Sequence, residues 1–281
     1  MEQIFLNGEF LPIDKAKVSV LDRGFLYGDG LFETIRCYNG KFFRFDLHYQ
    51  RLKKSLQILK ININQNIKIL KDLSYKVLEL NNIKDGFLKI IVTRGISKER
   101  GLDFSNVNNP TLLIQAGSYK PFPLELYKKG VDLYTVNIPH SQLNLKTLSF
   151  LNNVLARYEV LSKGGFEGIF LSEKGEIIEG TISNIMFIKE DCIIVPRSKF
   201  ALSGVTKKIL LKLIKDNKFM VYNKRRVFLN EIENFSEGFI TNSLIEIMPV
   251  RTINKKLITE TPQKTIELLN LYHKEVKRQC Y

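Results

Sequence analysis

Cysteine and histidine are scarce in this chain of 281 residues, which carries three of each. The cysteines Cys37, Cys192 and Cys280 are odd in number, widely scattered and without the close spacing of metal ligands. Such sparse cysteine usage is typical of a reducing compartment, so we expect a cytoplasmic protein. The three histidines are equally far apart, which argues against a zinc site and predicts no bound metal.

Long apolar runs are also missing. The stretch over residues 87–92 is interrupted by Lys89, and nothing longer approaches the length of a membrane-spanning helix. Residues 1–10 contain Glu2, Asn7 and Gly8 instead of a basic segment followed by an apolar one, so we expect that they are not a secretory signal. We therefore expect a soluble protein without a membrane partner.

Acidic residues are outnumbered, with 29 against 43 lysines and arginines, which gives a formal net charge of +14. The lysines are spread along the whole chain, which favours a solvated surface over a nucleic-acid partner. The run Lys224-Arg225-Arg226 offers one basic cluster, but no helix-turn-helix, RRM or zinc-finger motif accompanies it. We expect no nucleic-acid partner, and the positive charge is compatible with small anionic substrates.

The composition is ordinary for a globular protein, with 44% hydrophobic and 26% charged residues, which excludes disordered and fibrous classes. At about 150 residues per domain, the length suggests one large or two modest domains. Pro121 and Pro123 lie in a short polar stretch that has the character of a linker. We predict a smaller N-terminal α+β domain over residues 1–118, a linker over 119–123 and a larger domain over 124–281.

Turn signals and hydrophobic periodicity predict strands and helices in both halves. Asn7-Gly8 and Asn39-Gly40 each favour a hairpin turn, and Asp46 is placed to cap a following helix. Strands are expected at residues 4–6, 10–13, 31–37, 41–45, 87–93, 111–117, 131–138, 168–172, 177–179, 185–189 and 192–195, near 239, and at 247–250. Helices are expected at residues 47–59, 66–80, 149–162 and 205–216, and from about 262 onwards.

Three segments carry residues that suit chemistry. Lys146 lies in a mostly apolar stretch between a predicted strand and a helix, where loss of water favours a neutral, nucleophilic amine. Glu179 begins a polar turn between two apolar strands, and a carboxylate at a strand end can face a site. Gly204-Val205-Thr206 opens a predicted helix, whose first amide groups suit a phosphate.

Each segment also has an ordinary structural interpretation. A lysine in a loop commonly extends its amine to solvent, a carboxylate at a strand end commonly caps a hairpin, and Ser203 is a common type of N-cap residue. For each segment taken singly the structural interpretation is favoured. The order of the motifs along the chain decides between the two.

Five motifs follow one another along the chain: Tyr27-Gly28-Asp29-Gly30-Leu31-Phe32-Glu33-Thr34-Ile35-Arg36, His48-Tyr49-Gln50-Arg51-Leu52, Lys146, Glu179-Gly180-Thr181-Ile182-Ser183-Asn184, and Gly204-Val205-Thr206. In this order and spacing the chain resembles the class IV pyridoxal-phosphate-dependent aminotransferase family, of fold type IV, over about residues 3–255. The resemblance implies a two-domain α+β enzyme with the D-amino acid aminotransferase-like fold. It also implies that pyridoxal 5′-phosphate is bound in the cleft between the domains.

The resemblance implies roles for individual residues. Lys146 matches the lysine that binds the cofactor covalently and moves the proton at the substrate carbon. Glu179 matches the carboxylate that faces the pyridine nitrogen, where negative charge favours the protonated ring. Tyr27 and Arg94 fall where the family lines the substrate side. Four positions match groups around the cofactor phosphate: Arg51, Val205, Thr206 and Ser243.

Within the family, the residues favour the aminodeoxychorismate lyases over the branched-chain aminotransferases. Phe150 is the nearest match to a tyrosine that branched-chain enzymes usually carry after the lysine, and Thr34 stands where they tend to have glycine. The segments most like the lyases are Thr93-Arg94-Gly95 with Arg100-Gly101, the turn over residues 179–184, and Thr241-Asn242-Ser243-Leu244 with Pro249-Val250.

The resemblance therefore implies the conversion of 4-amino-4-deoxychorismate to 4-aminobenzoate and pyruvate, a step of folate synthesis, in a homodimer. The alternative is an aminotransferase that passes an amino group between a branched-chain or D-amino acid and a 2-keto acid. In either case the expected partner is a small anionic amino or keto acid.

Overall fold

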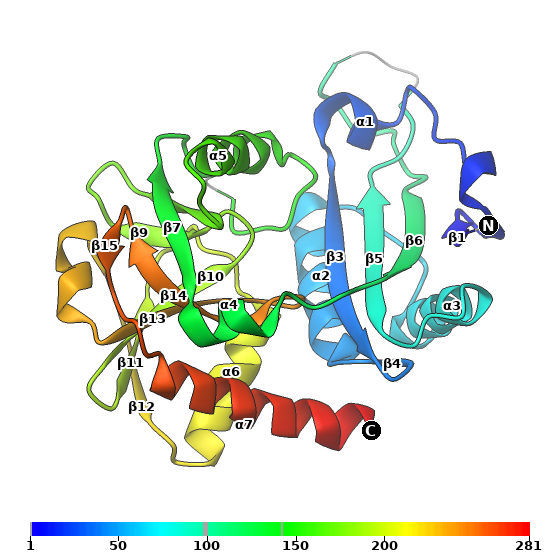
Figure 1. Cartoon of the computed structure of the whole chain (residues 1–281). Helices are drawn as coiled ribbons and strands as arrows, with labels where there is room; N and C mark the ends of the chain where they lie inside the picture. Colours follow the sequence, from blue (N-terminus) through cyan, green and yellow to red (C-terminus); the bar gives the residue numbers. More distant parts are fainter. Residues whose placement is uncertain (1, 98–100, 142) are drawn as a thin grey trace. The chain divides into compact units, whose positions relative to one another are not determined.

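The computed structural model describes residues 2–97, 101–141 and 143–281, so Arg100 lies outside the described residues. The chain packs as two compact units (Figure 1). The first holds Met1–Lys120, Leu145–Phe150 and Arg278–Tyr281, and the second holds Pro121–Asn144 and Leu151–Lys277. The segment that carries Lys146 thus packs in the first unit, although the sequence places it in the second domain.

The described part of the first unit contains a six-stranded antiparallel sheet in the order β2-β1-β6-β5-β3-β4. The strands are β1 (Gln3–Leu6), β2 (Glu9–Pro12), β3 (Gly30–Tyr38), β4 (Lys41–Phe42), β5 (Gly86–Thr93) and β6 (Thr111–Ser118). The predicted hairpin at Asn7-Gly8 is confirmed, because both residues have a positive φ and Leu6 pairs with Glu9. The strand predicted over residues 41–45 is shorter, because the helix that follows begins at Phe45.

The helices of this unit are α1 (Arg23–Tyr27), α2 (Phe45–Leu59) and α3 (Ile67–Leu80), and α2 and α3 lie against the sheet (Figure 1). Their apolar faces, with Leu52 and Leu70, pack on sheet residues such as Leu88 to form the core of the unit. The prediction that Asp46 caps α2 is wrong. The N-cap is Arg44, in the left-handed region at φ 55°, and Asp46 falls inside the first turn.

The described part of the second unit contains a nine-stranded mixed sheet, ordered β12-β11-β10-β13-β14-β7-β8-β9, with β15 added beside β14. Its strands are β7 (Val131–Val136), β8 (Glu167–Leu171), β9 (Ile177–Gly180), β10 (Asn184–Lys189), β11 (Cys192–Pro196), β12 (Val221–Arg225), β13 (Glu237–Asn242), β14 (Glu246–Ile253) and β15 (Lys256–Leu257). The inner strands are apolar on both sides: Met186, Phe187, Phe239 and Ile240 are all fully buried. This burial explains their continuous apolar runs in the sequence.

The helices of the second unit are α4 (Leu124–Lys129), α5 (Leu151–Ser162), α6 (Val205–Asp216) and most of α7 (Gln263–Cys280). The helix predicted from residue 149 begins at Leu151, because the residues before it pair with β3 in the first unit. Within the described residues, no helix combines the length and the apolar character that crossing a membrane requires.

Candidate active site

Lys146 is held along the edge of β3 in the first unit. The amide of Phe32 donates to the Lys146 carbonyl at 2.9 Å, and the amide of Leu148 donates to the Gly30 carbonyl at 3.0 Å. Gly28 makes this approach possible, because a Cβ there would lie 2.5 Å from the Ser149 hydroxyl oxygen. The glycines of the first motif therefore leave room for the lysine segment.

The amine of Lys146 lies against aromatic rings. Its Nζ atom is 4.2 Å from the centre of the Phe32 ring and 5.8 Å from that of Phe150. These two rings meet edge to face, 5.4 Å apart. The Nζ atom of Lys89 on β5 lies 5.3 Å from the same Phe32 ring. Two aromatic rings, one of which also contacts the ammonium group of Lys89, thus lie beside the candidate nucleophile.

Arg51 is positioned by two buried residues that sequence reasoning did not assign a role, Glu33 on β3 and His48 on α2. Its Nε and Nη2 atoms each donate to Glu33 at 2.7 Å, and His48 Nδ1 lies 2.8 Å from Glu33 Oε2. Burial opposes the ionisation of Glu33, but the charge and hydrogen bonds of Arg51 outweigh it and lower its pKa to about 2. Burial lowers the pKa of His48 against the opposing effect of Glu33. The guanidinium plane of Arg51 is therefore fixed by a carboxylate that is charged at neutral pH.

Replacing Glu33 by glutamine is expected to destabilise the first unit strongly. Breaking a buried ion pair by removing one partner typically costs about 3–5 kcal/mol. The folded-state pKa of Glu33 is depressed from 4.5, so its stabilisation is present above that value and is lost as the pH falls toward about 2. Urea unfolding should show a smaller difference between wild type and variant in acid than at neutral pH. The exposed Glu79→Gln is the control, and a difference that does not change with pH would contradict this assignment.

Arg94 and Tyr27, the two expected substrate-side residues, are both linked to the Asp29 carboxylate in the first unit. Arg94 contacts it directly, and Tyr27 is linked through Arg23, whose Nε donates to Asp29 at 2.9 Å. Arg94 is buried and donates to Asp29 through Nε at 2.7 Å and Nη2 at 3.0 Å, and its Nη2 also donates to the Leu59 carbonyl. Tyr27 is 44% exposed, and the Arg23 guanidinium lies 5.0 Å from its ring centre. Arg94 thus connects the Asp29 loop to the end of α2, whereas the aromatic ring of Tyr27 is exposed to solvent.

Glu179 is the next-to-last residue of β9 in the second unit, and it is buried, with 9% of its surface exposed. Its Oε2 atom accepts from Asn184 Nδ2 at 2.9 Å and from the Leu202 amide at 2.8 Å. Its Oε1 atom lies 3.1 Å from His140 Nε2, a contact for which the sequence gives no signal. Three groups from separate segments thus fix the carboxylate.

The N-terminus of α6 lies beside this carboxylate. Its N-cap is Gly204 rather than Ser203, and it makes no side-chain capping hydrogen bond. A Cβ at Gly204 would lie 2.0 Å from Asn184 Oδ1, so glycine lets the asparagine and the helix start approach each other. Val205 and Thr206, both 3% exposed, supply amides of the first turn, which suit an anion.

Ser243 lies in the turn between β13 and β14. Asn242 Oδ1 shapes this turn by accepting from the amides of Leu244 at 2.8 Å and Ile245 at 2.9 Å. Thr241 pairs with Asn184 across the β10–β13 ladder, which brings Ser243 to the sheet end that holds Glu179. The structure thus gathers four predicted residues in the second unit, namely Glu179, Val205, Thr206 and Ser243. The other four lie in the first, namely Lys146, Arg51, Tyr27 and Arg94.

Unpaired polar atoms mark the sheet end around Glu179. Four buried side-chain atoms have no hydrogen-bond partner among the described residues, and three of them are here: His140 Nδ1, Glu167 Oε2 and Thr241 Oγ1. Buried polar groups are normally paired, so this concentration suits a site built for an additional polar group. The residue types fit pyridoxal 5′-phosphate: in the second unit a carboxylate suits its ring nitrogen and a helix N-terminus its phosphate, and in the first unit a lysine suits its aldehyde and an arginine its phosphate.

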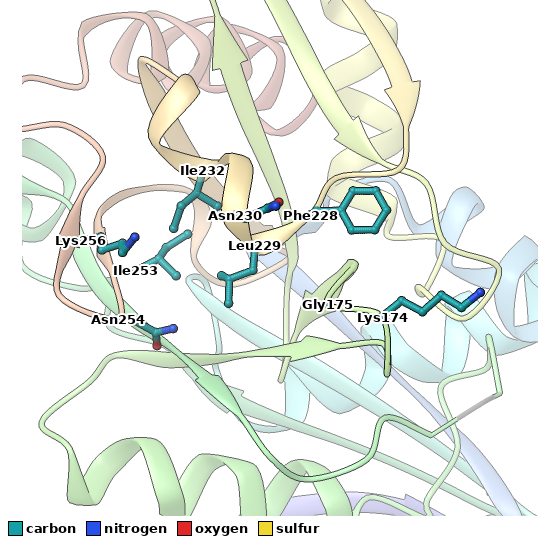
Figure 2. Close-up of a pocket in the computed structure, with 9 residues that line it drawn as sticks. All are labelled: Lys174, Gly175, Phe228, Leu229, Asn230, Ile232, Ile253, Asn254 and Lys256. Carbon is teal, nitrogen blue, oxygen red and sulfur yellow. The ribbon is translucent and has the colours of Figure 1, made fainter.

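A cavity of about 420 Å³ lies in the second unit (Figure 2). Leu229, Ile232 and Ile253 line it, and the Lys174 side chain extends away from them (Figure 2). The described residues around this cavity include none of the predicted site residues.

Residues 30–253 match the model of the amino-transferase class IV family. The chain belongs to this family. Membership confirms the predicted enzyme class and its cofactor, pyridoxal 5′-phosphate. The sequence is 34% identical to the aminodeoxychorismate lyase of Bacillus subtilis strain 168, over 99% of this chain and 96% of that protein. It is 33% identical to a D-alanine aminotransferase of Staphylococcus aureus strain N315, over 92% of each chain.

A provisionally named branched-chain-amino-acid aminotransferase of Methanocaldococcus jannaschii is 35% identical over 94% of each chain. Among solved structures, the branched-chain amino acid aminotransferase of Escherichia coli superposes with a TM-score of 0.90. It is 24% identical and covers 97% of this chain and 94% of its own. The class IV fold is thus confirmed. The curated relatives carry different activities at nearly equal identity, so they establish the family but not the reaction.

Proposed function

We propose that this class IV enzyme is an aminodeoxychorismate lyase, which converts 4-amino-4-deoxychorismate to 4-aminobenzoate and pyruvate. The observation that carries the proposal is the surface beside the Lys146 amine. The Phe32 and Phe150 rings offer apolar contacts to the cyclohexadiene ring of the substrate and to the aromatic ring of the product, and the ammonium of Lys89 on the same Phe32 ring suits a substrate carboxylate. Phe150 also lacks the hydroxyl that the resemblance assigns to branched-chain enzymes at this position.

The binding roles follow from the geometry of each residue. Lys146 would bind the cofactor through its amine, and Glu179 would face the ring nitrogen. Arg51, held by Glu33, would donate to the phosphate together with Ser243 and the first-turn amides of Val205 and Thr206. When bound, pyridoxal 5′-phosphate supplies a ring that withdraws electrons from the amino nitrogen of the substrate. Its place in a cleft between the two predicted domains stays a prediction.

The reaction needs one base and no co-reactant. The Lys146 amine would remove the proton from the ring carbon that carries nitrogen, and the bond from the neighbouring carbon to the enolpyruvyl oxygen would break. The released enolpyruvate takes up a proton to become pyruvate, and the remaining ring becomes aromatic. Aromatisation makes the elimination strongly favourable, and the carboxylate of Glu179 stabilises positive charge on the cofactor ring throughout.

The test supplies the cofactor-loaded enzyme with enzymatically generated 4-amino-4-deoxychorismate and follows both products. Equal release of 4-aminobenzoate and pyruvate supports the lyase. Absence of both products, from protein that still shows the absorption of bound cofactor, would contradict it. In that case a panel of L- and D-amino acids with 2-oxoglutarate or pyruvate tests the alternative, an aminotransferase. The Staphylococcus aureus relative is named as a D-alanine aminotransferase.

A homodimer is the proposed assembly, and helix α5 supports it. Five exposed apolar residues recur at helical spacing along one side of α5: Leu151, Val154, Leu155, Tyr158 and Leu161. A continuous apolar stripe of this kind is rarely left in water, and a two-fold dimer would bury two copies of it. The cytoplasmic location expected from the sparse cysteines stays a prediction.

Replacing Tyr158 by glutamate is expected to convert the dimer to a monomer, because Tyr158 is 76% exposed at the middle of this stripe. A charge buried in an apolar interface without a partner is strongly unfavourable. Light scattering after gel filtration should give a mass near the 32.6 kDa of one chain for the variant and twice that for the wild type. Lys163→Glu, just beyond the helix, should leave the mass unchanged. A monomeric wild type, or a dimeric Tyr158→Glu, would contradict the assignment.

A further inference from the structure

Glu167, the first residue of β8, is a buried carboxyl group to which no role has yet been given. It is 1% exposed. Its Oε1 atom accepts from the Ile182 amide at 2.8 Å and the Ser183 hydroxyl at 2.8 Å, with the Thr181 hydroxyl at 3.5 Å. Its Oε2 atom has no hydrogen-bond partner among the described residues. One oxygen of a single side chain thus organises three consecutive residues of the turn after Glu179.

Stability alone explains this arrangement poorly. Burial raises the pKa of Glu167 to about 7, despite the hydrogen bonds from Ile182 and Ser183. A buried carboxyl with an unpaired oxygen carries a desolvation cost that an apolar side chain of similar size would avoid. Gly180 leaves room for this carboxyl group, because a Cβ at Gly180 would lie 2.4 Å from Glu167 Oε1. The backbone is shaped to bring the carboxyl onto the turn.

The turn that Glu167 holds connects two groups of the cofactor site. It begins directly after Glu179 and ends at Asn184, whose Nδ2 donates to Glu179 at 2.9 Å. The other amide atom of Asn184, Oδ1, packs against Gly204 at the start of α6. A change in the turn would therefore alter both the direction of the Glu179 carboxylate and the position of the helix N-terminus.

We propose that Glu167 is a positioning residue, whose carboxyl group fixes residues 181–183 and thereby the direction in which Glu179 presents its carboxylate to the cofactor ring. It acts through Glu179 and touches neither substrate nor cofactor. The inference rests on the proposed role of Glu179 in the cofactor site, and it holds for a lyase and an aminotransferase alike.

The experiment compares Glu167→Ala and Glu167→Gln with a matched control, Glu237→Ala. Glu237 is also buried, and it also accepts three hydrogen bonds, from the Lys264 and Thr265 amides and the Thr265 hydroxyl. It pairs with Ile188, at the other end of β10 from Asn184. Loss of either carboxyl group should lower the melting temperature, so melting alone does not test the proposal.

The first readout is amide hydrogen exchange of the apoprotein. Glu167→Ala should speed exchange in a peptide that covers residues 180–184, Glu167→Gln should restore slow exchange, and Glu237→Ala should leave this peptide unchanged. Glutamine is expected to restore slow exchange because its side-chain carbonyl oxygen can still accept hydrogen bonds from the Ile182 amide and the Ser183 hydroxyl. Unchanged exchange in Glu167→Ala would overturn the proposal. If Glu167→Ala does not fold, Ser183→Ala replaces it, because that change removes one of the donors.

The second readout is a double-mutant cycle with Glu179→Gln, using whichever reaction the wild type performs. Glu167→Ala should lower kcat about 100-fold, the loss that a misplacement of about 1 Å can cause, with little change in KM. In the Glu179→Gln background the same change should cost less than about threefold, since a residue that acts through Glu179 has nothing left to orient. Equal losses in both backgrounds would overturn the proposal. A Glu179→Gln variant with wild-type kcat would instead contradict the proposed cofactor site itself.

Discussion

Replacing Lys146 by alanine is expected to abolish turnover, with kcat falling about ten-thousandfold or more. In the proposed site the amine of Lys146 is both the group that binds the cofactor and the base for the substrate proton, and a positioned base alone contributes about 10²- to 10⁴-fold. The residual rate of Lys146→Ala, measured with saturating pyridoxal 5′-phosphate, checks this result. The absorption band of the covalently bound cofactor should disappear at the same time.

Lys89 provides the contrast, since its amine lies over the same Phe32 ring. Lys89→Met should raise KM for the substrate more than it lowers kcat, because a carboxylate partner binds substrate and transition state alike. If Lys89→Met lost the bound cofactor and Lys146→Ala kept it, the roles of the two lysines would have to be exchanged. The carbonyl of Lys146 is already tied to β3, so alanine at this position should leave the backbone of the segment intact.

Replacing Glu179 by glutamine is expected to keep the cofactor bound while lowering kcat about 100- to 1,000-fold. Removing one preorganised electrostatic group typically costs this much. Glutamine can still accept from Asn184 and the Leu202 amide, the two donors to Glu179 Oε2, so the turn should hold its shape. The neutral side chain no longer stabilises the protonated ring, which is the part of the role that the charge supplies.

Glu176→Gln is the control for Glu179, because it removes a carboxylate of the same hairpin whose ion-pair partner is Arg226. It should retain wild-type kcat and cofactor affinity. Spectrophotometric titration with pyridoxal 5′-phosphate and initial rates on the same preparations separate binding from catalysis. A Glu179→Gln enzyme with wild-type kcat, or one that has lost its cofactor, would contradict the proposed electrostatic role.

The sequence was sufficient to predict the family because the order and spacing of the five motifs can be read directly along the chain. Asn7-Gly8 forms its hairpin, Asn66 caps α3 through a hydrogen bond from the Ile69 amide, and Gly204-Val205-Thr206 opens α6. These features depend on residues that are adjacent along the chain. Local turn and capping chemistry decides them before tertiary packing contributes.

The features that were missed depend on contacts between distant residues. The lysine segment packs on β3 because Gly28 and Gly30 leave space for it, which no spacing rule reveals. His140 reaches Glu179 from 39 residues away. Glu33 and His48 stand inside recognised motifs, yet only the folded chain shows that they hold Arg51. Arg44 is the N-cap of α2 and has a left-handed conformation, although residue preferences for the N-cap favour an aspartate such as Asp46, two residues later.

Borohydride reduction of the cofactor-loaded wild type, followed by tryptic peptide mass spectrometry, tests the central assignment most directly. Reduction fixes the cofactor to the lysine that holds it, and a modified Lys146 blocks cleavage at that residue. We expect one labelled peptide that spans residues 130–157, because no lysine or arginine other than Lys146 lies between Lys129 and Arg157. A label on a peptide that contains Lys89, or on any lysine other than Lys146, would contradict it.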